Sequence, residues 1–80
     1  MTTEEIDQLL TEALAGVFNR DIDVSRPLMR ESVKEWDSIK HMELIFAIEA
    51  ATGLNFNEEQ IAAIKSVDDL RRALGDLRAT

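Results

Sequence analysis

Apolar residues recur at helical spacing in the first part of the chain. Their offsets of three and four are typical of the buried stripe of an amphipathic helix. The stripe consists of Ile6, Leu9, Leu10, Ala13, Leu14, Val17 and Phe18. Thr2 and Glu5 fit a capping box before it, and acidic residues fill the first turn, where the helix dipole favours them. The pattern predicts a first helix over residues 3–18.

The segment that follows, residues 19–36, shows no sustained period and contains the only proline of the chain. A connection of this length is uncommon in a compact domain and often carries function. Apolar residues are scattered along it, so we expect it to be pinned across a core rather than to act as a flexible linker. The expected anchors are Ile22, Val24, Leu28, Met29, Val33 and Trp36.

A second helix is predicted to begin at Asp37 or Ser38 and to run to Thr52, with Gly53 as its C-terminal stop. Because a helix turns about 100° per residue, its apolar residues fall on two sides. The expected core face consists of Leu44, Ile45, Ile48 and Ala51. The second stripe consists of Ile39, Met42 and Phe46, flanked by Glu43 and Glu49.

The second stripe has two interpretations. An apolar strip rimmed by acids is a reasonable docking surface for a partner protein. Alternatively, Met42 and Phe46 fold inward beneath the long loop and belong to the core. One helix of an 80-residue bundle is hardly buried on all sides, so we expect the stripe to be at least partly exposed and to combine both roles.

Two shorter patterns complete the chain. A short third helix is predicted over about residues 58–64 after the capping residue Asn57. It is expected to bury Ile61 and Ile64. Ser66 with Asp69 caps a last helix. Its apolar residues at helical spacing are Val67, Leu70, Ala73, Leu74 and Leu77.

No strand alternation or internal repeat occurs, so the expected fold is all-α, with four helices around one core. Eighty residues form a single domain, residues 1–80. Hydrophobic residues make up 45% of the chain and charged residues 31%, which is a globular composition.

The chain has no cysteine, which excludes disulfides and thiolate metal sites. It shows no leader or long apolar run, so we expect a cytoplasmic protein.

Charge narrows the classes of partner. Sixteen acidic residues against nine basic ones give a net charge of −7. Nucleic acids and anionic membranes repel such a surface, so we expect neither as a partner. Basic protein surfaces are favoured because complementary charge speeds encounter. Moderate negative charge also simply keeps small proteins soluble, and charge alone does not decide between these interpretations.

Ser38, at the start of the second helix, is the candidate for chemistry. Serine is a common N-cap, and position alone favours that role. The alternative is a covalent phosphate group on Ser38, an anion that the helix N-terminus stabilises, with Asp37 sharing the capping. A serine nucleophile would need a base and an oxyanion hole. His41 is the only histidine and lies toward the core side, so we expect it to be packed or bonded to the loop, and we expect no catalytic residue.

Two stretches of the sequence have part of a metal-binding pattern, and we expect neither to bind a metal ion. Asp37 and His41 stand one helical turn apart but lack a third ligand. Residues 21–32 begin like a calcium loop, with oxygen-bearing side chains at alternate positions. However, Arg26 replaces the glycine of the sharp turn, and Ser32 replaces the bidentate glutamate.

The stretch WDSIKHMELIFAIEAATGLNF, residues 36–56, resembles the phosphopantetheine-binding acyl and peptidyl carrier proteins. The family pattern is Asp-Ser-Leu, a helix with Glu-Leu near its second turn, and an acidic helix end before a glycine-hydrophobic turn. The matching residues are Asp37-Ser38-Ile39, Glu43-Leu44, Glu49 and Gly53-Leu54. The expected helix order, long first loop and short third helix also match, so the resemblance covers nearly the whole chain.

The resemblance implies a non-catalytic carrier. A phosphopantetheinyl transferase would attach 4'-phosphopantetheine from coenzyme A to Ser38, and cargo would travel as a thioester on the arm. Asp37 would lie at the attachment site. A cargo-loading ligase or transferase and downstream biosynthetic enzymes would dock through basic patches. The partner-reading surface would consist of Ile39, Met42, Glu43, Phe46 and Glu49, together with Asp37.

The sequence departs from the family pattern around the serine. Ile39 replaces the usual leucine, Trp36 stands where many fatty-acid carriers have a small residue, and Lys40 and His41 follow Ser38. These differences indicate a stand-alone carrier of a dedicated pathway rather than the housekeeping fatty-acid carrier. We also expect the protein to be a monomer. An aminoacyl or peptidyl carrier and an unmodified helical interaction module remain as alternatives.

Overall fold

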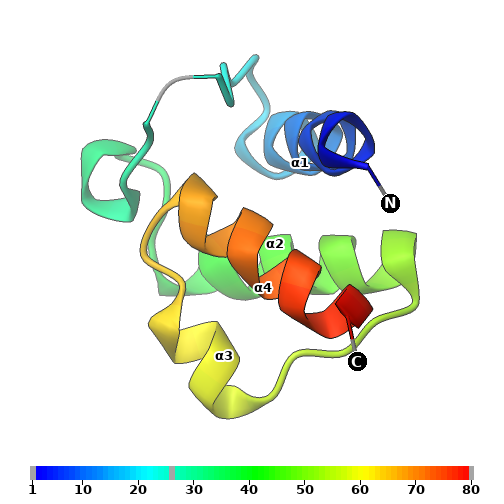
Figure 1. Ribbon diagram of the computed structural model, residues 1–80. Helices are drawn as coiled ribbons and strands as arrows, with labels where there is room; N and C mark the ends of the chain where they lie inside the picture. The colour runs from blue at the N-terminus through cyan, green and yellow to red at the C-terminus, as the bar shows by residue number, and fades with distance from the viewer. Residues whose placement is uncertain (1, 26, 80) are drawn as a thin grey trace.

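A computed structural model of the protein describes residues 2–25 and 27–79, with side chains described as far as residue 76. In this part of the chain there are four α-helices, one turn of 3-10 helix and no strand (Figure 1). They are α1 (Thr3–Phe18), η1 (Arg30–Ser32), α2 (Ser38–Thr52), α3 (Glu58–Ala63) and α4 (Val67–Ala79). The prediction of an all-α fold with four helices is therefore confirmed.

The predicted caps set the ends of the helices. Before α1, Thr2 Oγ1 accepts a hydrogen bond from the backbone N–H of Glu5 at 3.2 Å, and Glu5 Oε1 accepts one from the N–H of Thr2 at 3.0 Å. Before α4, Ser66 Oγ accepts from the N–H of Asp69 at 3.1 Å. Gly53 ends α2 in the left-handed region, with φ 73°, a conformation that glycine adopts without a steric cost.

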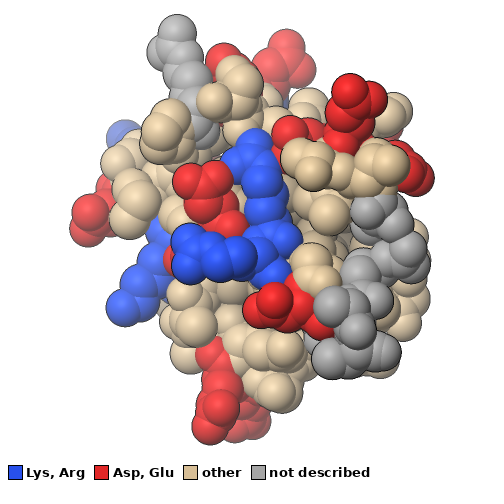
Figure 2. Space-filling model, viewed as in Figure 1, with Lys and Arg blue, Asp and Glu red and all other residues tan. Residues whose placement is uncertain are grey.

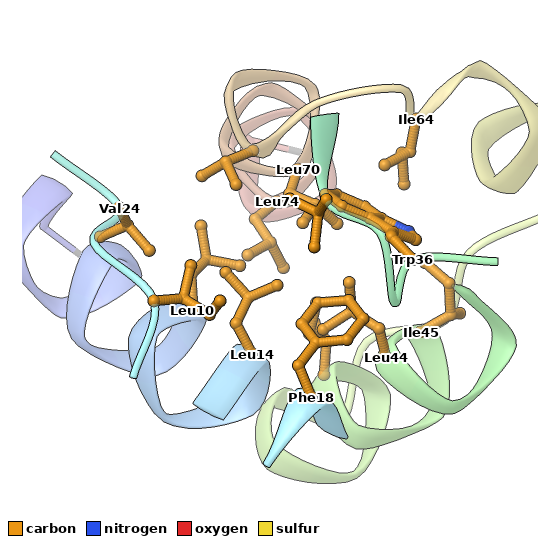
Figure 3. Packing of buried hydrophobic residues seen from close by; sticks show 14 of the residues in the cluster. Leu10, Leu14, Phe18, Val24, Trp36, Leu44, Ile45, Ile64, Leu70 and Leu74 are labelled. Atoms are coloured by element: carbon orange, nitrogen blue, oxygen red, sulfur yellow. The ribbon is translucent and has the colours of Figure 1, made fainter. Parts of the chain in front are cut away.

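The core lies between α1, α2 and α4 and is closed by the long loop between α1 and α2. Figure 3 shows Trp36 and Val24 reaching from this loop into the cluster that the helices form. The buried hydrophobic residues are Leu10, Leu14, Phe18, Ile22, Val24, Val33, Trp36, Leu44, Ile45, Ile48, Phe56, Ile64, Val67, Leu70 and Leu74. Nearly all of the apolar residues expected in the core are therefore there or pack against its edge.

The prediction of burial is wrong for two residues, and the end of the third helix also differs from the prediction. Ala51 is exposed, because the buried face of α2 consists of His41, Leu44, Ile45 and Ile48 and does not extend to residue 51. Met29 is 44% exposed, because its loop segment runs along the surface. The third helix ends at Ala63 rather than at residue 64, with Ile64 buried and Ile61 half-buried. The side chain of Leu77 lies outside the described residues.

The long loop is pinned by backbone bonds as well as by apolar anchors. Residues 28–30 form an antiparallel bridge with the connection between α3 and α4. The N–H of Arg30 donates to the carbonyl of Lys65 at 2.7 Å, and the N–H of Val67 donates to the carbonyl of Leu28 at 2.9 Å. Segments far apart in the sequence are thereby held at one end of the molecule, next to the start of α2 (Figure 1).

Arg71 of α4 joins three parts of the fold. Its Nε donates to Asp7 of α1 at 2.6 Å, and its Nη atoms donate to Asp68 and to the carbonyl of Val24 in the loop. The hydrogen bond to Asp7 is the main reason why the pKa of Arg71 lies above its ordinary value. Figure 2 shows this face, where lysine and arginine side chains lie beside carboxylates rather than forming a free basic patch.

An ion pair between Arg20 and Glu35 joins the beginning and the end of the long loop. The hydrogen bond from Arg20 is the main reason why the pKa of Glu35 lies below its ordinary value. Because the folded-state pKa is the lower one, the pair stabilises the fold above the ordinary pKa, and this stabilisation is lost as the pH falls through the folded-state value. We expect the Arg20→Gln variant to be slightly less stable than the wild type at pH 7 and equally stable in strong acid.

Urea unfolding followed by the fluorescence of Trp36, the only tryptophan, measures this difference at each pH. In the control, Arg20→Gln is added to a chain that already carries Glu35→Gln. This addition should cause no pH-dependent change in stability, because the titrating carboxyl group is absent. A constant gap between wild type and Arg20→Gln at every pH would contradict the assignment.

Candidate functional site

Asp37, not Ser38, caps α2. Its Oδ1 accepts a hydrogen bond from the N–H of Lys40 at 2.8 Å, and its carbonyl accepts one from the N–H of His41 at 2.8 Å. Ser38 is the first residue inside the helix and is exposed. The interpretation of Ser38 as the N-cap is therefore wrong, and the expectation that Asp37 takes part in capping is confirmed.

The Ser38 hydroxyl is left available by this arrangement. Within the described residues, it has no hydrogen-bond partner, and neither do the backbone N–H groups of Ser38 and Ile39. Unpaired N–H groups at a helix N-terminus, together with the positive end of the helix dipole, favour an anion there. A phosphate ester on Ser38 Oγ would therefore lie where the helix offers donors, while Asp37 keeps its capping bond.

The outer side of α2 is apolar and largely open to solvent. Ile39 is 71% exposed and Phe46 is 59% exposed, whereas Met42 between them is half-buried. The prediction that this stripe is at least partly exposed is confirmed, and the alternative in which Phe46 folds inward as core is wrong. On the opposite side of the helix, Leu44, Ile45 and Ile48 are fully buried, so α2 is apolar on two sides for two different reasons.

The acids beside the stripe have different surroundings. Glu43 is exposed and pairs with Lys40, with Nζ and Oε2 3.1 Å apart. Glu49 is half-buried, and its Oε2 accepts the N–H of Phe56 at 2.8 Å, which ties α2 to the segment leading to α3. Glu43 is therefore the flanking carboxylate best placed to contact a partner protein. Glu49 is less accessible, and its hydrogen bond to Phe56 holds parts of the fold together.

His41 is a buried link between three segments. The indole N–H of Trp36 donates to His41 Nδ1 at 2.8 Å, and His41 Nε2 lies 2.9 Å from the carbonyl of Ile61 in α3. Since an indole nitrogen only donates, Nδ1 accepts and the proton is on Nε2, which donates to Ile61. The ring of His41 also stacks on Trp36, with centroids 6.0 Å apart. The expected packed, loop-bonded histidine is confirmed.

Sequence reasoning missed a surface groove near the start of α2. The groove combines residues from the long loop with Lys65 from the connection between α3 and α4. No local pattern marks such a site, because its walls are brought together only by the bridge between the two segments. The sequence analysis expected Met29 to be a core anchor, and only the structure shows that it is 44% exposed beside this groove.

The chain was compared with models of protein families, with curated proteins and with solved structures, and none of the three comparisons found a match. Among the described residues, no group of three or more His, Asp or Glu side chains is placed to hold a metal ion. Arg26, where the calcium-loop pattern breaks, lies outside these residues. None of the helices in the described part is both long and apolar enough to cross a membrane.

Proposed function

We propose that the protein carries acyl groups as thioesters on a 4'-phosphopantetheine arm attached to Ser38. The observation that carries this proposal is the exposed, unpartnered hydroxyl of Ser38 at the start of α2, next to an aspartate that does the capping. The resemblance of residues 36–56 to carrier proteins supports it. So does the order of the elements, with a long first loop and a third helix of only six residues.

In the chemical step of the attachment, the chain itself supplies only the Ser38 hydroxyl. Ser38 Oγ attacks the phosphorus of coenzyme A that bears the pantetheine group, and a new P–O bond forms. The P–O bond to the other phosphate of the pyrophosphate breaks, adenosine 3',5'-bisphosphate leaves, and the serine proton passes to a base of the transferase. The product is a phosphodiester anion at a helix N-terminus, where it is favoured. The attached phosphopantetheine arm ends in a thiol, a functional group that the chain itself lacks because it has no cysteine.

The outer side of α2 serves as the docking surface in this proposal. Ile39 and Phe46 provide exposed apolar contacts close to the attachment point, and Glu43 adds a carboxylate beside them. The centre of a protein interface is apolar and its rim polar, so basic patches on the transferase, the loading enzyme and the biosynthetic enzymes fit this surface.

Incubation with coenzyme A and a broad-specificity phosphopantetheinyl transferase, followed by intact mass measurement, tests the proposal. The expected result is the addition of one phosphopantetheine group per chain. An unmodified interaction module that uses the same side of α2 would bind partners and gain no mass. Absence of a mass gain under conditions that modify a known carrier would therefore overturn the carrier proposal.

The docking surface makes its own prediction. We expect Phe46→Ser to raise the KM of the transferase for the protein by about tenfold, because centrally placed apolar side chains dominate binding. Glu43→Lys should raise it too, since it reverses a charge that faces a basic patch. Glu12→Lys on α1 makes the same change of charge at an exposed residue that is not part of the proposed docking surface and is the matched control. Equal KM values for all three variants and the wild type would rule this surface out.

A further inference from the structure

A groove with a volume of about 430 Å³ lies beside the loop that leads into α2. Its lining residues are Met29, Arg30, Glu31, Trp36 and Lys65. The antiparallel bridge builds it, because the bond from the N–H of Arg30 to the carbonyl of Lys65 holds these two residues side by side. The volume is within the range of sites for small organic ligands, about 300–1,000 Å³.

The two cations of the groove differ from most of the other described basic residues in having no carboxylate partner, a property that they share with exposed Lys34 outside the groove. Elsewhere in the described part of the chain, four basic side chains are each paired with a carboxylate. They are Arg20, Lys40, Arg71 and Arg72. Within the same part, Arg30 and Lys65 have no carboxylate partner; Arg30 Nε makes only a long bond of 3.4 Å to the carbonyl of Trp36. Glu31 lies on the same wall and forms no ion pair with either. Two unpaired cations at one groove of a protein with net charge −7 indicate an anionic ligand.

The rest of the groove is apolar. Met29 is 44% exposed, and Trp36 also lines the groove although only 4% of it is exposed. An adaptable thioether beside an aromatic ring suits an aliphatic chain. The groove therefore combines contacts for a short hydrocarbon chain with two cations for a charged end.

The position of the groove connects it with Ser38. Trp36 stands two residues before Ser38, so their Cα atoms are at most about 7.6 Å apart. We propose that the groove binds the far end of the cargo carried on Ser38, and that this cargo is a short acyl chain ending in a carboxylate. This inference rests on the proposed function for the attachment at Ser38. The groove itself can be tested without it.

The first test uses the unmodified protein with free pentanoate as the probe and pentanol as the uncharged control. Trp36 lines the groove and is the only tryptophan, so its fluorescence reports binding. We expect saturable binding of pentanoate and none of pentanol. Lys65→Gln should weaken binding about tenfold, because it removes a charge-assisted contact. Lys34→Gln, which changes an exposed lysine outside the groove, should leave binding unchanged. Equal responses to both probes, or equal effects of the two variants, would overturn the proposal.

The second test uses protein loaded at Ser38 from glutaryl-coenzyme A or from pentanoyl-coenzyme A. In NMR spectra, we expect the backbone amides of Arg30 and Lys65 to shift with the glutaryl cargo and not with the pentanoyl cargo. Identical spectra for the two cargoes would refute the assignment of the cargo. If Ser38 accepts no arm at all, the proposed function fails, and the free-pentanoate titration still decides whether the groove binds carboxylates.

Discussion

The Ser38→Ala variant is expected to gain no mass when it is incubated with coenzyme A and a phosphopantetheinyl transferase, whereas the wild type gains one phosphopantetheine group. The physical reason is that alanine has no oxygen to attack the pyrophosphate. The fold should be unaffected, because Asp37 makes the capping bond to Lys40 and the Ser38 hydroxyl makes none within the described residues. Intact mass measures the modification, and circular dichroism checks the helix content.

Ser32→Ala is the matched control for this experiment. Ser32 is also exposed and lies in the short helix η1 of the long loop, so a general loss of reactivity would affect both variants. We expect Ser32→Ala to be modified as fast as the wild type. A mass gain that survives in Ser38→Ala would move the attachment site to another residue and contradict the assignment made from α2.

The largest effect on stability is expected from His41→Leu. Leucine fills a similar space but accepts no hydrogen bond from the Trp36 indole and donates none to the carbonyl of Ile61. A buried donor without a partner is costly, so we expect a loss of about 2–4 kcal/mol in the free energy of unfolding. A domain of this size has only about 4–12 kcal/mol in total. Urea unfolding followed by circular dichroism measures the loss.

A double-mutant cycle identifies the cause of this loss. In His41→Leu with Trp36→Phe, both members of the buried hydrogen bond are replaced by apolar groups, and such a pair is less costly than one orphaned partner. We therefore expect the double variant to be more stable than the sum of the two single changes indicates. Simple additivity would mean that packing, and not the hydrogen bond, gives His41 its role.

The link through His41 also bears on α3. This helix has only six residues, and such short helices are not stable on their own. In addition to buried Ile64, the bond from His41 to Ile61 and the bond from Phe56 to Glu49 join this region to α2. The same region borders the start of α2, so loss of the His41 link would disturb the surroundings of Ser38 as well as the core.

The helices were predictable because their signals are local. The apolar stripe of residues 3–18, the caps at Thr2 and Ser66, and the stop at Gly53 all act within one or two turns of the chain. The two wrong core assignments have a different origin. Both residues are apolar, and Ala51 also falls at the spacing of the core face. Burial depends, however, on which neighbouring segment covers a residue, and both Ala51 and Met29 are exposed. Hydrophobicity alone does not decide coverage.

Periodicity and capping chemistry were thus sufficient for the number, order and approximate bounds of the helices, and for the two apolar sides of α2. The tertiary structure decided whether Ser38 or Asp37 caps α2, how far each residue on its outer side is exposed, and how His41 is paired. It also created the groove, whose walls at residues 29–36 and at Lys65 lie about thirty residues or more apart in sequence. Contacts between such distant segments arise from packing and backbone bridging, which no local pattern encodes.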